Sequence, residues 1–119
     1  MEPINQDTVQ SLLDAFVDKR VYIHVEITSG MYASHVDQEV FNAGTFVRNV
    51  QVNIVEAIIK KAENDQYRVG IKLDNGGWIY VIGLTHFIVN EEAEFIMHGF
   101  NYQGKLASAL ELSHQPFRK

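Results

Sequence analysis

The chain has 119 residues, no cysteine, a formal net charge of −5 and 46% apolar residues. This length fits a single domain over residues 1–119, with enough apolar side chains for a core. The lack of cysteine excludes a disulfide framework, a thiolate metal site and a cysteine nucleophile. No stretch is apolar for long enough to span a membrane, and the first residues lack the positive charge of a secretory signal. We therefore expect a cytoplasmic protein.

The charges are unevenly distributed along the chain. Residues 1–40 hold seven of the fifteen acidic residues but two of the ten basic ones. The lysines and arginines form no cluster that alternates with aromatic residues, as binding to a phosphate backbone would require. The sequence thus predicts neither a nucleic-acid nor a membrane partner, and it places an acidic surface in the N-terminal third.

The first twenty residues predict one α-helix. Apolar residues recur at helical spacing, as Val9 and Leu13 illustrate. Asn5 is a suitable N-cap, and Lys19 and Arg20 supply positive charge at the C-terminal end. Because such a short helix is marginally stable alone, it must pack on the rest of the chain.

From residue 21 onward, apolar residues alternate with polar ones in short runs separated by turns. The clearest turn is Asn75-Gly76, since both residue types tolerate the positive φ of a hairpin. We expect strands at residues 21–28, 31–36, 46–61, 67–73, 78–85, 87–89, 94–100 and 105–113. The predicted fold is mainly β: an antiparallel meander over residues 21–119 that forms a barrel-like, strongly curled sheet, with one N-terminal α-helix.

A register can be proposed for the central hairpins. Pairing Leu73 with Trp78 places eight side chains on one face: Tyr67, Val69, Ile71, Leu73, Trp78, Tyr80, Ile82 and Leu84. The preceding turn would add Ile59 opposite Ile71 and Ala57 opposite Leu73. Strand 78–85 is also apolar on its second face, so we expect it to be covered on both sides, with the helix on one of them.

One group of residues could bind a divalent metal ion. His24 and Glu26 project from the same face of a strand, and His35 lies on the strand expected to pair with it after the Ser29-Gly30 turn. Two imidazoles and a carboxylate are suitable ligands for zinc or a similar ion. The simpler interpretation is a solvated polar face with no cofactor, because a polar face of an antiparallel strand normally meets water.

Trp78 and Tyr80 share a strand face and could line a small-ligand pocket, because some barrels hold one small molecule. The simpler interpretation is that both belong to the core. Nothing else in the chain carries a catalytic signature: there is no nucleophile elbow, phosphate loop or dinucleotide fingerprint.

Several segments together resemble the YojF-like family of Bacillus-type bacteria, a domain of unknown function. They are YIHVE (22–26), YASH (32–35), YRVGIKL (67–73), GWIY (77–80), GKLA (104–107), LELS (110–113) and PF (116–117). The resemblance implies a mainly β, cytosolic protein of a Gram-positive bacterium. It also implies a possible partner, because members tend to be encoded beside a LmbE-like N-deacetylase of bacillithiol synthesis. It implies no catalytic residues.

These observations favour a non-enzymatic accessory or binding module, and the resemblance implies a link to the LmbE-like deacetylase. Two alternatives stay open: a small metal-dependent enzyme built on His24, Glu26 and His35, and a small-ligand-binding barrel that uses Trp78 and Tyr80. A homodimer formed by strand pairing at an exposed sheet edge is also plausible.

Overall fold

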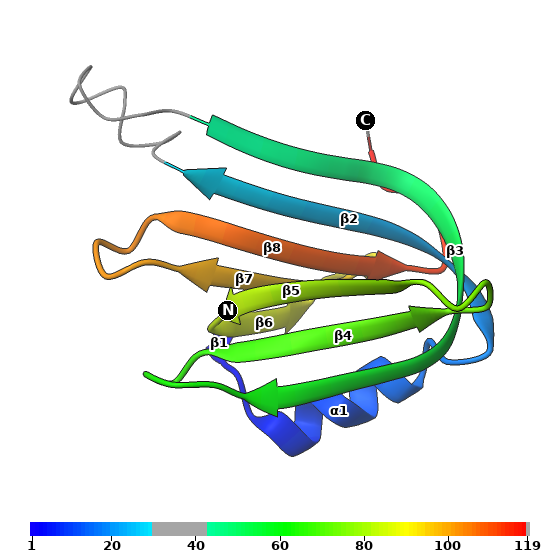
Figure 1. The fold of residues 1–119 in the computed structure, drawn as a ribbon, viewed down its shortest axis with the longest axis horizontal. Helices are drawn as coiled ribbons and strands as arrows, with labels where there is room; N and C mark the ends of the chain where they lie inside the picture. The colour runs from blue at the N-terminus through cyan, green and yellow to red at the C-terminus, as the bar shows by residue number, and fades with distance from the viewer. Residues whose placement is uncertain (30–42, 119) are drawn as a thin grey trace.

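The computed structural model describes residues 1–29 and 43–118. Within these ranges it contains one short helix and eight strands (Figure 1). In chain order they are β1 (Glu2–Pro3), α1 (Gln6–Asp14), β2 (Lys19–Ser29), β3 (Ala43–Lys61), β4 (Tyr67–Leu73), β5 (Trp78–Leu84), β6 (His86–Val89), β7 (Phe95–Phe100) and β8 (Leu106–Ser113). No helix of the described residues is long and apolar enough to cross a membrane.

The eight strands form one antiparallel sheet in the order β1-β6-β7-β8-β2-β3-β4-β5, curled into a half-barrel (Figure 1). Consecutive strands pair within β2–β5 and within β6–β8, and β8 returns to pair with β2. β1 pairs with β6, and the two edge strands β1 and β5 do not pair with each other, so the barrel stays open between them. The expected mainly β, barrel-like fold with one N-terminal helix is therefore confirmed.

Helix α1 is shorter than expected. The Asn5 side chain caps it by accepting a hydrogen bond from the Thr8 backbone N–H at 3.1 Å, as the sequence indicated. The helix ends at Asp14, and a turn that includes Asp18 with a φ of 62° leads directly into β2. Lys19 therefore lies in a strand, but its Nζ still donates to the Ala15 carbonyl at 3.0 Å.

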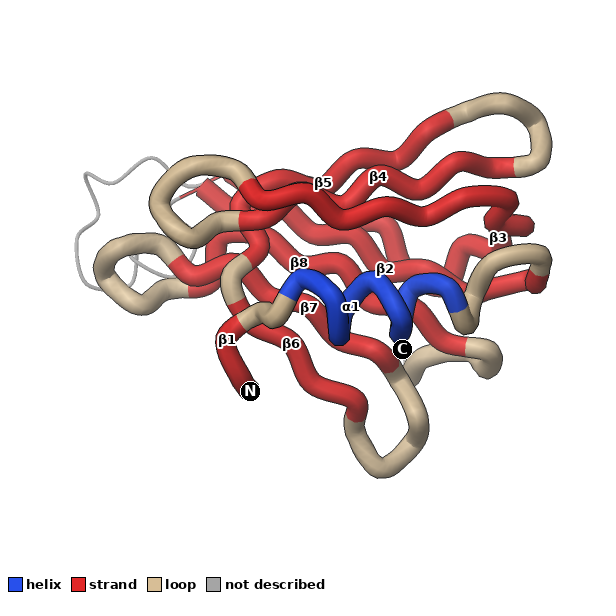
Figure 2. Tube along the Cα trace, turned by 90° about the horizontal axis from the view of Figure 1, so that it is seen from below, coloured by secondary structure: helices blue, strands red, loops and turns tan. Residues whose placement is uncertain are grey.

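Helix α1 also covers the part of β3 that has no strand neighbour along the edge facing β2. β2 pairs with β3 only as far as Ile54, so one edge of the second half of β3 is open there. Gln10 fills this gap: its Nε2 donates to the Ala57 carbonyl at 2.9 Å, and its Oε1 accepts from the Ile59 N–H at 3.0 Å. Figure 2 shows the helix lying along this side of the sheet.

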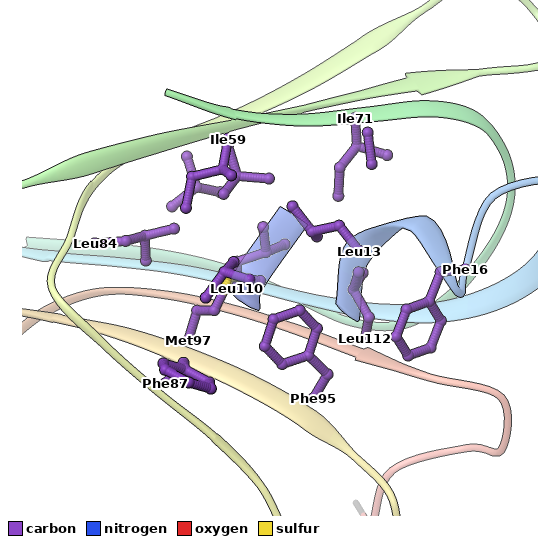
Figure 3. Packing of buried hydrophobic residues seen from close by; sticks show 14 of the residues in the cluster. Leu13, Phe16, Ile59, Ile71, Leu84, Phe87, Phe95, Met97, Leu110 and Leu112 are labelled. Atoms are coloured by element: carbon purple, nitrogen blue, oxygen red, sulfur yellow. The ribbon is translucent and has the colours of Figure 1, made fainter. Parts of the chain in front are cut away.

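The core lies between the inner face of the curled sheet and the apolar face of α1 (Figure 3). Leu13 lies on the buried face of the helix, and Phe16, in the turn after it, reaches β7, where the rings of Phe16 and Phe95 stack with centroids 6.3 Å apart. The largest side chains with almost no exposed surface are Phe95, Leu13, Ile23, Ile54, Ile71, Leu84, Met97, Leu110 and Leu112.

The proposed register of the β4–β5 hairpin is wrong by one residue along most of its length. Tyr67 pairs with Leu84 as expected, but Gly83, with a φ of 87°, is an extra residue that shifts the rest of the pairing. Ile71 therefore lies opposite Ile79 and not opposite Tyr80. Because side chains alternate along a strand, this shift turns three of the eight expected core side chains outward: Trp78, Tyr80 and Ile82 are exposed.

The β3–β4 register also differs from the expectation, but by two residues, which preserves the face. Ile59 lies opposite Val69, and Ala57 lies opposite Ile71. These four side chains are buried together as expected. An irregularity between Ile54 and Glu56 interrupts the pairing of β3 with β4.

Candidate functional site

A cluster of charged and histidine side chains lies on the outer face of strands β2, β3, β7 and β8. We call His24, Glu26, Arg48, His98 and Glu111 the polar cluster. His24 is directly opposite Glu111 on β8 and opposite Arg48 on β3. His98 lies two residues from the β7 partner of Glu111 and so projects from the same face.

Short contacts join these side chains. His24 Nε2 is 3.1 Å from Glu26 Oε1, so the predicted proximity of these two residues is confirmed. Glu111 Oε2 lies 3.9 Å from His24 Nε2 and also 3.9 Å from His98 Nε2. The His24 residue is only 5% exposed, which makes these partners necessary, because a buried polar group without them would be costly.

Arg48 fixes the tautomer of His24. Its guanidinium, which can only donate, lies 3.2 Å from His24 Nδ1. Nδ1 must therefore accept, so the ring proton sits on Nε2 and is donated to Glu26. Arg48 is itself held by the C-terminal tail: its Nε donates to the Arg118 carbonyl at 2.7 Å, and its guanidinium lies 5.1 Å from the centre of the Phe117 ring.

Asn49 forms the bulge that brings the tail to this place. It has a φ of 61° and is the extra residue where the β2–β3 register shifts. Its side chain makes two hydrogen bonds with the backbone of Phe117, accepting from N–H at 2.7 Å and donating to the carbonyl at 2.8 Å. The tail is thereby tied to the strand that carries Arg48.

Glu111 is the member of the cluster whose protonation is clearly perturbed. Burial by itself raises the pKa of its carboxyl group, but this effect is outweighed by a hydrogen bond with the His98 side chain and by electrostatic interactions with His24, His98 and Arg48. The net result is a pKa below the ordinary value of 4.5. Glu111 therefore carries its negative charge at neutral pH, where it balances the guanidinium of Arg48.

The cluster has limited means to hold a metal ion. A ligating imidazole normally donates its second N–H to an acceptor, whereas His24 Nδ1 faces the donor Arg48. Among residues 1–29 and 43–118, no three His, Asp or Glu side chains are arranged to hold a metal ion. His35 lies outside the described residues, so the complete site of His24, Glu26 and His35 stays a prediction.

A second candidate site lies on the outer side of β3, β4 and β5. We call this surface, with Ile58 and Lys60 on β3, Arg68, Gly70 and Lys72 on β4, and Trp78, Tyr80 and Ile82 on β5, the aromatic face. Its three large side chains on β5 are 39%, 60% and 63% exposed, in chain order. The interpretation of Trp78 and Tyr80 as core residues is therefore wrong, and both are accessible to a ligand.

The two rings of the aromatic face are held in a defined arrangement. Trp78 and Tyr80 stack with centroids 5.4 Å apart and planes within 9° of parallel. The Tyr80 ring leans over Gly70, where an added Cβ would come within 2.8 Å of its Cε1. The Lys72 ammonium lies 6.0 Å from the centre of the Trp78 ring. Together with Glu56, the face encloses a hollow of about 410 Å³.

Known proteins share both the sequence and the fold of this chain. The family described as "Protein of unknown function (DUF1806)" matches residues 3–117. The chain belongs to this family. It is 40% identical over 117 residues to the uncharacterized protein YojF of Bacillus subtilis (strain 168), covering 98% of both chains. It also resembles the crystal structure of Bacillus subtilis YojF with a TM-score of 0.80 and 37% identity, covering 99% of this chain and 97% of that one.

This membership confirms the resemblance that the sequence suggested. The family description assigns no reaction, so function has to be argued from the two sites. Sequence reasoning found His24 and Glu26 but missed His98 and Glu111. The 101–104 turn could have indicated that β7 and β8 pair, but nothing local indicates that β8 returns to β2.

Proposed function

We propose that this protein is a non-enzymatic accessory or binding module whose recognition surface is the aromatic face. The observation that carries the proposal is the exposure of Trp78, Tyr80 and Ile82 on a regular strand. Large exposed apolar side chains grouped on one surface mark binding sites more often than chance, and tryptophan, tyrosine and arginine dominate binding hot spots.

The polar cluster supports a structural role in preference to catalysis. A general base needs an available lone pair near a substrate. In His24, Nδ1 accepts from Arg48, and the Nε2 proton is donated to Glu26. The cluster joins β2, β3, β7 and β8 and anchors the C-terminal tail through Arg48, which is a sufficient reason for its presence.

We further propose that the module serves the LmbE-like N-deacetylase of bacillithiol synthesis in the cytosol of a Gram-positive bacterium, as the family resemblance implies. The contact surface would be the exposed acidic side of α1 and the turn after it, formed by Asp7, Asp14 and Asp18. Acidic side chains at the surface fit a basic patch on a partner, and such contacts weaken as salt screens them over about 8 Å at physiological ionic strength.

Co-purification of the protein with the deacetylase from the same genome, at several salt concentrations, tests this proposal. We expect association at low salt that weakens as salt rises, and that weakens further in the double variant Asp14→Asn, Asp18→Asn. The matched control is Glu91→Gln, Glu92→Gln, which removes two exposed acids from the β6–β7 turn. Absence of association at low salt would contradict the accessory role.

A small metal-dependent enzyme is the second candidate, favoured by the contact of His24 with Glu26 and by the proximity of Glu111 to His24 and His98. It requires stoichiometric metal in the purified protein and a turnover that His24→Ala abolishes. Both results together, in a protein that does not associate with the deacetylase, would replace the accessory role with this one.

A further inference from the structure

The aromatic face leaves one side of the Tyr80 ring available. The strand register places Gly70 and Tyr80 in one row, Lys72 and Trp78 in the row on one side, and Arg68 and Ile82 in the row on the other. Tyr80 stacks on Trp78, so its second side faces the row of Arg68. A flat ring bound on that side would leave the stack of Trp78 and Tyr80 in place and would meet the exposed side chain of Ile82.

Two cations stand together in that same row. Lys60 on β3 lies directly opposite Arg68 on β4, and like charges in this position destabilise a strand pair. Within the described ranges, neither side chain has a carboxylate within the 4.0 Å of an ion pair. An anion bound between them would relieve this repulsion.

The size of the hollow indicates the size of the occupant. Its volume of about 410 Å³ falls in the range of roughly 300–1,000 Å³ found for small-molecule sites. Lys60, Arg68, Trp78 and Tyr80 all line it, so one molecule can meet the rings and the cations at once. Glu56 lines the opposite end, and its carboxylate can accept a hydrogen bond from a donor on the same molecule.

We propose that the aromatic face binds a small anionic molecule that carries a flat aromatic ring. The ring stacks on the open side of Tyr80, and a phosphate or carboxylate group lies between Lys60 and Arg68. This inference rests on the proposed role of the aromatic face as the recognition surface, and it names the class of ligand.

Trp78 is the only tryptophan of the chain, so its fluorescence reports on this site directly. Adenosine 5′-monophosphate and phenyl phosphate serve as probes, with adenosine and inorganic phosphate as their ring-only and anion-only controls. We expect a saturable change with at least one probe, and binding about tenfold weaker or more for each control, because a hydrogen bond to a charged group contributes that much.

Substitutions on the aromatic face test which side chains contact the probe. Arg68→Gln and Tyr80→Ala should each weaken binding of the probe about tenfold or more. Both residues are exposed, so their replacement leaves the core intact. The matched controls are Lys61→Gln, whose side chain pairs with Asp65, and Tyr102→Ala, whose ring is 88% exposed on another turn. Both controls should bind as the parent protein does.

Three results would overturn the inference: no saturable response to either probe at millimolar concentration, equal binding by adenosine alone, or tighter binding of a single-stranded oligonucleotide than of the mononucleotide.

Association with the deacetylase is a separate measurement. A protein that binds the deacetylase but neither probe refutes the ligand alone, whereas one that binds a probe but not the deacetylase refutes the accessory role alone.

Discussion

Glu111 connects residue-level electrostatics to the stability of the whole sheet. Its pKa is lowered in the folded protein, where His98, His24 and Arg48 outweigh the effect of burial. A carboxyl group whose folded-state pKa lies below its unfolded value contributes stability that is fully present above the unfolded pKa. This contribution is lost as the pH falls through the folded-state pKa.

We therefore expect Glu111→Gln to be less stable than the parent protein at neutral pH, with a difference in the free energy of unfolding that shrinks as the pH is lowered below 4.5. Denaturant unfolding at a series of pH values measures this difference. Glu91→Gln, in an exposed turn, controls for the loss of one negative charge. A difference that stays constant over the acidic range would show that the charge of Glu111 does not matter.

At the scale of the strands, β5 shows why its outward face could not be assigned from sequence. The strand is apolar at successive positions, so alternation fits either face equally well. Gly83 determines which face of β5 turns outward, because its positive φ inserts one residue into the pairing with β4. The only sequence signal of such a bulge is a glycine inside a strand.

Substitutions of two isoleucines on adjacent strands can distinguish the observed register from the expected one. Ile71 is fully buried, whereas Ile82 is 63% exposed. Ile71→Ala should lower the free energy of unfolding by about 2–5 kcal/mol, the usual cost of truncating a packed aliphatic side chain. Ile82→Ala should change it by less than about 0.5 kcal/mol, as is usual at the surface. Thermal or denaturant unfolding measures both, and equal losses would restore the expected register.

Gln10 makes two of the hydrogen bonds that join α1 to β3. Gln10→Ala would leave the Ile59 N–H and the Ala57 carbonyl without their partners. An unpaired buried backbone group costs about 1–3 kcal/mol, so we expect a loss of that size in the free energy of unfolding. Ser11→Ala, on the exposed side of the same helix, is the matched control. A loss no larger than that of Ser11→Ala would mean that water replaces Gln10 without cost.

At the scale of the whole molecule, the fold class followed from the sequence but the order of the strands in the half-barrel did not. Alternation, turns and one helical stripe are local patterns, and they predicted an antiparallel, curled sheet. The pairing of β8 with β2 joins distant parts of the chain. So does the contact of Gly99 with the Gly83 carbonyl, where an added Cβ could not fit. These features, together with the polar cluster, depend on strand order, which local patterns do not determine.

The same topology leaves part of β3 without a neighbour along one edge. Its first half pairs with β2, and β4 begins only opposite Ile54. Residues 43–52 therefore have no strand partner along this edge within the described part of the chain, and the C-terminal tail binds the side chains of Arg48 and Asn49 there. Phe46 and Val47 are 64% and 42% exposed there. An exposed edge with apolar side chains favours pairing with another strand.

We expect this edge to pair with the same edge of a second copy in a two-fold antiparallel arrangement, with Val47 of each copy opposite the other. Light scattering after gel filtration should then give the mass of a dimer that dissociates on dilution. Val47→Lys should shift the protein to a monomer, because two buried ammonium groups would face each other across the axis. Val89→Lys, at a 44% exposed position on β6, should leave the dimer intact. A parent protein that is monomeric at high concentration, or a dimer that survives Val47→Lys, would show that the open edge of β3 is not the contact.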